Sequence, residues 1–231
     1  MAERKDMERF GPLAGLIFVL LGALSFVIGG DPTDLDEPAA EYARYWAEND
    51  TEQVISAILG AYAAVAFLWF SGSVREFVAR VEPGKARLAS IAQAGAAIVA
   101  TGLLINSAIQ FAAAETVEKV TPETTQALGA LYENFFFPMA GGMAAFLLAA
   151  GIGAVRHGAF DRRLGSIAIA IAVVMLTPAG LIGFIASMIW TGLAAVVLYR
   201  KKDPVGSGAA PPPSGGSGIE IPPGAGPTAP A

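Results

Sequence analysis

Cysteine is absent from this 231-residue chain, and histidine occurs only once, at His157. Without cysteine there can be no disulfide framework, no CxxC redox pair and no thiolate metal site, and one histidine cannot build a two-histidine metal centre. The GxSxG, HExxH and phosphate-loop motifs are missing as well. We therefore expect a protein that is not an enzyme and that holds no metal or cofactor.

Charged residues are also scarce. They make up 15% of the chain, against about 25% in a typical soluble domain, whereas hydrophobic residues make up 54%. We expect no nucleic acid partner: a formal net charge of -5 argues against one in a soluble protein, although here the distribution of charge along the chain is more informative than the sum. This composition indicates that the surroundings of most of the chain are a lipid bilayer.

The sequence contains several long apolar runs without charged residues. A helix needs about 20 mainly apolar residues to cross the hydrocarbon core of a bilayer. The last uncharged run, 164–199, is too long for one crossing, and the TPAG sequence at 177–180 is typical of a turn that divides it. The sequence therefore predicts an all-α membrane bundle of six transmembrane helices, at about 11–29, 54–72, 88–110, 135–155, 164–176 and 179–199.

The basic residues are unevenly distributed between the connections. All but Arg44 and Lys119 lie in the N-terminal segment 1–10, in the second and fourth connections, or directly after the last span. Because Lys and Arg collect in cytoplasmic segments, this pattern predicts that both termini are cytoplasmic. The first span is too long for a secretory signal and lacks a cleavage site, so we expect a retained anchor.

Two further segments outside the spans have distinct compositions. Residues 203–231 are rich in Pro, Gly and Ser and are predicted to be a disordered cytoplasmic tail.

The first outer connection, 31–52, is acidic, and its stretch EPAAEYARYWAEN places Tyr42, Tyr45 and Trp46 on one helical face. We expect a short amphipathic helix there, with its aromatic face against the headgroups or the bundle. The acidic residues fit a solvated loop better than a cation-binding or partner-binding lid, because they lack the spacing of a calcium loop.

The stretch LYENFFFPMAGG sets Glu133 and Asn134 directly against an apolar run. Counting back about 20 residues from Arg156, the inner end of this span, places Glu133 about one turn outside the hydrocarbon. Pro138 has no N–H to donate to the carbonyl of Asn134, so we expect a kink at this point.

The preceding span offers polar neighbours near the same boundary. Asn106 and Gln110 are four residues apart and therefore share a helical face. One hypothesis is an outward-facing pocket for a small ligand, lined by Asn106, Gln110, Glu133 and Asn134. The alternative, which the sequence favours slightly, is that these side chains form structural hydrogen bonds between helices.

Small residues recur at four-residue spacing in several spans, as in Ala179, Gly183, Ser187, Thr191 and Ala195 of the last. Such stripes let helix backbones approach closely in lipid. They indicate tight packing within one chain or, as the alternative, an interface between copies in a homo-oligomer.

Several stretches share their layout with known proteins: GPLAGLIFVLLGALSFVIGGDP, DEPAAEYARYWAENDTEQVISAILGAYAAVAFLWF, SVREFVARVEPGKARLA and LYENFFFPMAGGMAAFLLAAGIGAVR. Over about residues 10–202 the chain resembles a Gly- and Ala-rich family of multi-pass integral membrane proteins of actinobacteria, with about six helices and unknown function. The resemblance implies a bacterial plasma-membrane location. It assigns no site residue.

Two functions fit these observations. The first is a non-catalytic binding, sensory or scaffolding component, whose partners would be lipid and a membrane protein or a second copy. The alternative is a small transporter or transporter subunit, because PLAG at 12–15 and PMAG at 138–141 open two spans of opposite direction, as in an inverted repeat. Against ion-coupled transport, no charged residue lies deep in a predicted span.

Overall fold

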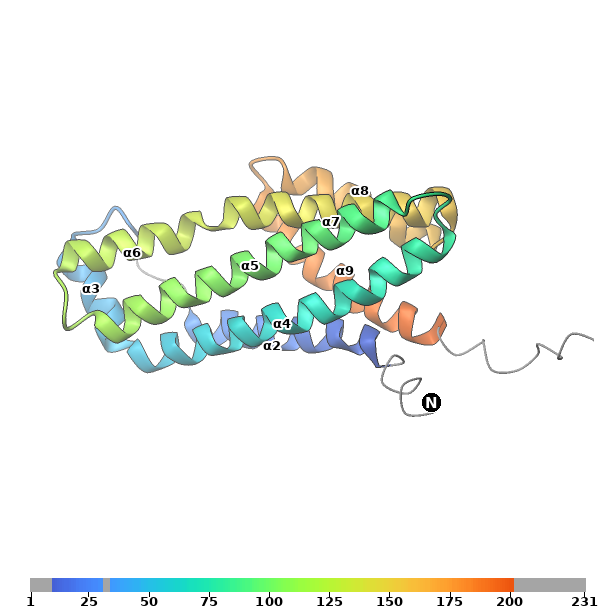
Figure 1. The fold of residues 1–231 in the computed structure, drawn as a ribbon. Helices are drawn as coiled ribbons and strands as arrows, with labels where there is room; N and C mark the ends of the chain where they lie inside the picture. Colours follow the sequence, from blue (N-terminus) through green and yellow to red (C-terminus); the bar gives the residue numbers. More distant parts are fainter. Residues whose placement is uncertain (1–9, 31–33, 202–231) are drawn as a thin grey trace, which may run out of the picture.

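The computed structural model describes residues 10–30 and 34–201, and within these residues it contains helices and no strand. Most of the predicted N-terminal segment (1–10) and the whole predicted tail (203–231) lie outside the described residues. The long helices run side by side along one direction, and both ends of the described chain lie at the same end of the bundle, on the right in Figure 1. An all-α bundle is thus confirmed.

The elements follow one another as η1 (Gly11–Leu13, a 3-10 turn), α2 (Ala14–Gly29), α3 (Ala39–Glu48), α4 (Asp50–Val81), α5 (Arg87–Thr116), α6 (Pro122–Asn134), α7 (Phe136–His157), α8 (Arg162–Met175) and α9 (Gly180–Lys201). Helices α6 and α7 continue almost as one helix and are separated only at Phe135. This interruption lies where Pro138 cannot donate a backbone hydrogen bond to the carbonyl of Asn134.

Five helical segments among the described residues are long and apolar enough to cross a membrane: Gly11–Gly29, Asp50–Val81, Arg87–Thr116, Pro122–His157 and Gly180–Lys201. Helix α8 is shorter, with 14 residues, and rises only about 21 Å at 1.5 Å per residue. It forms a hairpin with α9 through a turn at 176–179, within the region where TPAG predicts one.

Several helices extend beyond the apolar runs that identify them. The 32 residues of α4 rise about 48 Å, whereas the hydrocarbon core of a bilayer is about 30 Å thick. Helix α5, with 30 residues, is similarly long. The first turn of α4 and the last turns of α5, together with α3 and α6, build a further layer at the end of the bundle on the left in Figure 1, whereas residues 73–81 of α4 extend at the opposite end.

Aromatic rings and small residues fill the core between the spans. Phe67 and Phe146 meet edge to face with ring centroids 5.3 Å apart, and Trp190 contacts Phe146 at 6.1 Å. Where α5 crosses α7, a Cβ atom on Gly95 would lie 2.6 Å from the carbonyl oxygen of Gly142. Glycine is required at this crossing because the two backbones are in direct contact.

The two stretches that suggested an inverted repeat have different surroundings. Pro12 and Gly15 are buried, and a Cβ atom on Gly15 would press against Phe70 of α4. Pro138 and Gly141 are exposed, and a Cβ atom on Gly141 would have no neighbour within 4 Å. The two stretches therefore do not play matching roles in packing.

Candidate functional site

Helices α3 and α6, with the first turns of α4 and the last turns of α5, form a layer that we call the acidic cap. Tyr42 and Trp46 of α3 are fully buried in it, against Ala113 and Ala114 of α5 and Leu128 of α6. The aromatic face of the predicted amphipathic helix thus meets the bundle. Its burial gives the cap a small hydrophobic core separate from the core between the spans.

Close contacts hold α3 and its preceding loop against α6. Gly129 lies beneath the ring of Tyr42, and a Cβ atom there would overlap the ring and its hydroxyl. The Gln126 Nε2 amide donates hydrogen bonds to the carbonyl oxygens of Leu35 (2.8 Å) and Glu37 (2.9 Å). Burial raises the pKa of Tyr42 from 10.0 to about 12, because the interior disfavours the charged phenolate.

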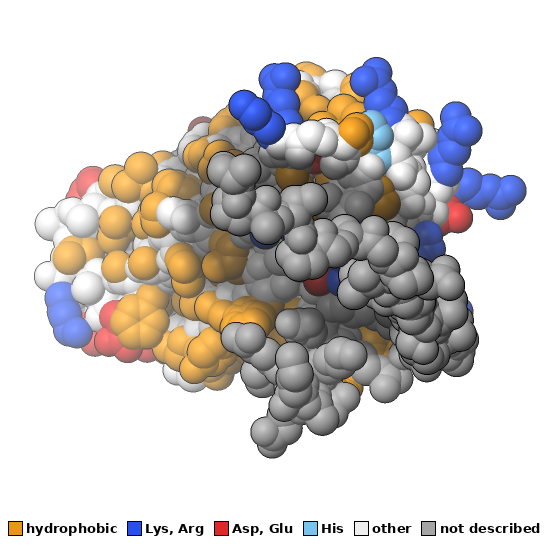
Figure 2. All heavy atoms as spheres, turned by 45° about the vertical axis from the view of Figure 1, so that its right-hand side comes forward, with side chains coloured by type: hydrophobic (Ala, Val, Ile, Leu, Met, Phe, Trp, Pro, Cys, Tyr) orange, Lys and Arg blue, Asp and Glu red, His pale blue; other side chains and the backbone are white. Residues whose placement is uncertain are grey.

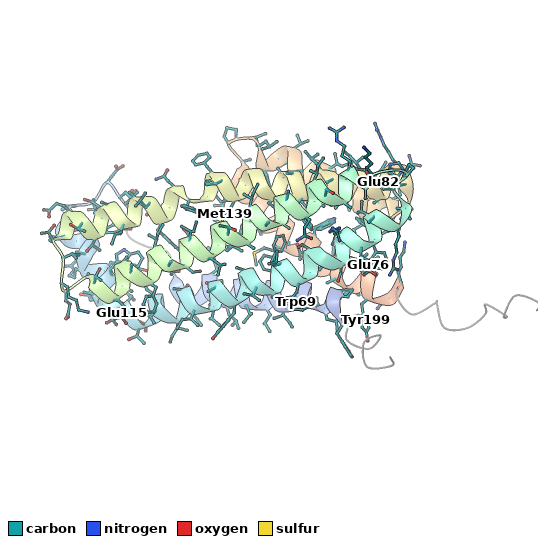
Figure 3. The ribbon with its side chains drawn as sticks, viewed as in Figure 1. Trp69, Glu76, Glu82, Glu115, Met139 and Tyr199 are labelled. Atoms are coloured by element: carbon teal, nitrogen blue, oxygen red, sulfur yellow. The ribbon has the colours of Figure 1, made fainter. Side chains whose placement is uncertain are left out.

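The surface of the cap is dominated by carboxylates: Asp34, Asp36, Glu37, Glu41, Glu48, Asp50, Glu52, Glu115, Glu118, Glu123 and Glu133. The described cations there are Arg44, whose Nε lies 3.9 Å from Glu48 Oε1, and Lys119, whose Nζ donates to the Glu115 carbonyl at 3.0 Å. Glu115 marks this end of the molecule in Figure 3. A hollow of about 250 Å³ lies between the start of α4 and the end of α5, and the charged residues in its lining are Asp50, Glu115, Glu118 and Lys119. The cap therefore presents a strongly negative surface.

A hydrogen-bond network joins three helices just below the cap. Gln110 Nε2 of α5 donates to Gln53 Oε1 (2.8 Å) and to Ser56 Oγ (3.1 Å), both on α4. Gln53 Nε2 in turn donates to the carbonyl oxygen of Gly29, at the end of α2. Ser25 Oγ of α2 donates to the carbonyl of Ser56 (2.9 Å), and Ser56 Oγ donates to the carbonyl of Ser25 (2.9 Å). Since Gln53, Ser56 and Gln110 are all buried, these bonds satisfy groups that lipid could not.

The four residues of the predicted polar pocket have unlike surroundings. Gln110 is buried in the network that joins α5 to α4, whereas Glu133 and Asn134 are exposed on α6. Asn134 Nδ2 donates to the carbonyl of Ala130, within its own helix, at 2.8 Å. Asn106 is half-buried, and its Oδ1 has no hydrogen-bond partner within the described residues. The geometry thus brings Gln110 together with residues of α4 and not with Glu133 or Asn134.

Sequence reasoning missed the partners of Gln110. Gln53 lies just before the apolar run that begins at Val54, so it was assigned to the acidic connection and not to a helix interface. Its spacing of three residues from Ser56 places both on one face of a helix, which is the signal that could have identified them. Helix α6 was also missed, although TPE at 121–123 is a typical helix start.

The opposite end of the bundle, which we call the basic end, carries Arg75, Arg80, Lys85, Arg87, Arg156, Arg162, Arg163, Arg200 and Lys201. In Figure 2 basic side chains project from the uncovered part of this end, and hydrophobic side chains dominate the surface between it and the acidic far end. The charges of the described residues are therefore separated along the length of the bundle.

The described carboxylates at the basic end are already engaged within the protein. Glu76 Oε1 pairs with Arg80 Nη2 at 2.5 Å. Glu82 accepts hydrogen bonds from the backbone N–H groups of Leu88 (2.7 Å) and Ala89 (3.1 Å), at the start of α5. Asp161 caps α8 in the same way, accepting from its second and third residues at 2.9 and 3.0 Å. The nine described basic residues of this end outnumber these three carboxylates, so the end carries a net positive charge.

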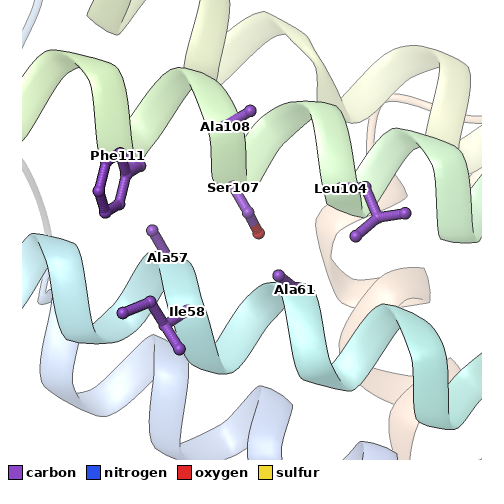
Figure 4. A pocket seen from close by; sticks show the side chains of 7 residues that line it. All are labelled: Ala57, Ile58, Ala61, Leu104, Ser107, Ala108 and Phe111. Atoms are coloured by element: carbon purple, nitrogen blue, oxygen red, sulfur yellow. The ribbon is translucent and has the colours of Figure 1, made fainter.

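A second hollow, of about 210 Å³, opens between α4 and α5 among the spans (Figure 4). Its lining is Ala57, Ile58, Ala61, Leu104, Ser107, Ala108 and Phe111. Ser107 supplies the single polar side chain of this lining. Such a surface suits a lipid chain and offers little for recognition of a polar ligand.

Among residues 10–30 and 34–201, no group of three or more Asp, Glu or His side chains is arranged to hold a metal ion. Comparison of the chain with protein-family models, with curated proteins and with solved structures finds no match.

Proposed function

We propose that this chain is a non-catalytic, multi-pass protein of a bacterial plasma membrane that binds a partner at its acidic cap. In this proposal the bundle has six spans, with the α8–α9 hairpin as the fifth and sixth, and both termini are cytoplasmic. The actinobacterial family that the sequence resembles would have the same layout.

The charge separation supports this orientation. Basic residues collect in cytoplasmic segments, and the described ones at the basic end far outnumber Arg44 and Lys119 at the other end. With the basic end at the cytoplasmic headgroups, the acidic cap faces outward. A hairpin whose first helix is short fits locally thinned lipid.

The observation that carries the binding role is the construction of the cap. Its aromatic residues Tyr42 and Trp46 are fully buried, so α3 is held as a fixed part of the surface. Helix α5 begins at Arg87 of the basic end and has 30 residues, which rise about 45 Å, so its last turns carry the layer beyond a hydrocarbon core about 30 Å thick. A folded, negatively charged layer outside the bilayer is suited to recognition of a protein surface of opposite charge.

The alternative function, transport, receives less support. The polar groups of Gln53, Ser56 and Gln110 bond to one another, and such a closed set stabilises helix contacts rather than a path for a solute. A transporter would have to break these bonds in each cycle. The unequal surroundings of Gly15 and Gly141 also weaken the case for an inverted repeat.

Photo-crosslinking in living cells tests the binding role. A crosslinking amino acid is placed at the exposed cap positions Glu41 and Glu48, and at Trp69 as a control. Trp69 lies on the outward surface of α4 between the two ends (Figure 3) and is 71% exposed. We expect discrete protein adducts from the cap positions that weaken when neighbouring carboxylates are changed to amides. Lipid adducts alone from every position would contradict the proposal.

A further inference from the structure

We propose that the connection between α7 and α8 is a binding site for the phosphate group of an anionic phospholipid, held by Arg156, Arg162 and Arg163. The acyl chains of this lipid would lie along the exposed face of α8. The inference concerns the opposite end of the molecule from the cap, and it holds whether or not the cap binds a partner.

The first argument is the uncompensated charge of these arginines. All three lack an ion pair to a carboxylate in the described part of the chain, and Arg162 and Arg163 are exposed, as is Arg156. Asp161, the nearest carboxylate in sequence, is bound to backbone N–H groups of α8. A negatively charged group from outside the protein would therefore meet little competition.

The second argument is the position of two of the arginines at the start of a helix. Arg162 and Arg163 are the first two residues of α8, whose first turn contains no acidic residue. The aligned peptide dipoles already place partial positive charge at a helix N-terminus, so cations there do not stabilise the helix. Because the Asp161 carboxylate already accepts hydrogen bonds from the N–H groups at the start of α8, the attraction for an external anion comes from the arginine side chains themselves.

The third argument identifies the anion as a lipid. The exposed residues of α8 follow one face, from Arg163 through Ser166 and Ile167 to Ala170 and Val174. Ile167 is 50% exposed and lies one turn beyond Arg163. A charged group followed by an apolar stripe matches the order of phosphate and acyl chain in a phospholipid. A nucleotide or free phosphate would leave this stripe unused.

The connection is also held in a fixed shape. Phe160 is 4% exposed and contacts the ring of Trp190, with centroids 6.2 Å apart. Trp190 Nε1 donates a hydrogen bond of 2.9 Å to the carbonyl of Leu164, in the first turn of α8. Gly158 ends α7 with a φ of 71°, a conformation that glycine adopts without strain. Preorganisation of this kind lowers the entropy lost when a ligand binds.

Thermal unfolding of the purified protein in a neutral detergent tests the site. Phosphatidylglycerol, phosphatidylcholine and inorganic phosphate are titrated separately, and the shift of the unfolding midpoint gives an apparent affinity for each. We expect stabilisation by phosphatidylglycerol alone. Each basic side chain at an anionic surface contributes about 1 kcal/mol, so Arg156→Gln/Arg162→Gln/Arg163→Gln should lose about 100-fold in affinity.

Matched variants separate a site from a general field. Lys85→Gln/Arg87→Gln removes charge at the same end but on the α4–α5 connection, and it should retain most of the affinity. Changing the three arginines to lysine should also retain most of the affinity for phosphatidylglycerol. This result would show that the glutamine variant loses affinity because it loses charge and not because it misfolds. If the triple glutamine variant does not fold, Arg163→Gln alone replaces it in the test. This single variant should lose about fivefold in affinity for phosphatidylglycerol.

Four results would overturn the proposal. They are equal stabilisation by phosphatidylcholine, an unchanged affinity in the glutamine variants, an equal loss in Lys85→Gln/Arg87→Gln, and protection by inorganic phosphate alone. The last result would identify a site for a free anion and not for a lipid.

Discussion

Replacement of Gly95 by alanine tests the packing of the bundle at the crossing of α5 and α7. The added Cβ atom would lie 2.6 Å from the Gly142 carbonyl oxygen and 2.7 Å from the Phe146 amide nitrogen, whereas ordinary contact begins at 3.4 Å. Both neighbours are backbone atoms, so the helices must separate by about 0.8 Å, which forfeits a quarter to a half of the attraction at the contact. Overpacking of this kind costs about 1–3 kcal/mol.

Gly141→Ala is the matched control, because this glycine adjoins Gly142 on α7 but a Cβ atom there would have no neighbour within 4 Å. Alanine is favoured over glycine in a helix by up to about 1 kcal/mol, which should leave Gly141→Ala unchanged or slightly stabilised and partly offset the clash in Gly95→Ala. We therefore expect Gly95→Ala to be less stable than the control by about 1–3 kcal/mol.

The assay is reversible unfolding in mixed micelles of a neutral detergent and dodecyl sulfate, followed by circular dichroism. If Gly95→Ala and Gly141→Ala unfold at the same dodecyl sulfate fraction, the backbones do not touch at this crossing, and the reasoning from close helix approach is refuted.

Three further predictions concern the polar network and the cap. Gln110→Leu should lower the free energy of unfolding by about 1–2 kcal/mol in the same assay, since it leaves buried polar groups on α4 without their donor. Gly129→Ala should loosen the cap, because its Cβ atom overlaps Tyr42; amide hydrogen exchange should speed up in α3 and α6 and stay unchanged in the spans. Burial raises the pKa of Tyr42 from 10.0 to about 12, so the stability contributed by its neutral form is complete below pH 10 and is lost as the pH rises toward 12. Tyr42→Phe should remove the share of this dependence that belongs to Tyr42, in ultraviolet titration and in unfolding.

Much of the architecture can be read from the sequence because lipid imposes simple rules. Apolar runs of sufficient length must be helical, and turn residues such as those at 177–180 divide a run that is too long. The aromatic face of the helix around Tyr42 and Trp46 follows from their spacing alone. The spacing does not tell whether that face meets lipid or protein, because both surroundings are apolar.

The extent of the helices was harder to predict. The apolar run at 54–72 is bounded by the polar residues Gln53 and Ser73, yet α4 extends from Asp50 to Val81. The charged and polar turns at the ends of α4 remain helical because neighbouring helices pack against them. The long-range contacts between α3, α5 and α6 leave no periodic pattern in any one segment of the sequence, so they could not be predicted.

The candidate polar pocket shows a similar limit. Spacing places Asn106 and Gln110 on one face of α5 but does not say which neighbouring helix that face meets. The preferred neighbour in the sequence interpretation was the segment with Glu133, because it follows next in the chain. Gln110 instead bonds to Gln53 and Ser56 of the preceding helix. This arrangement agrees with the structural alternative for Gln110, while a role for Asn106 and Glu133 in ligand binding stays a hypothesis.

The most direct test of the outward cap on a closed bundle is the labelling of single cysteines in intact cells with a membrane-impermeant thiol reagent, for which the cysteine-free chain is a clean background. Our account predicts that cysteine at Glu133 reacts, that cysteine at Gln110 does not, and that cysteine at Arg162 reacts only after the membrane is permeabilised. Reaction at Arg162 in intact cells would reverse the orientation. Reaction at Gln110 would contradict the closed network and favour an open polar pocket.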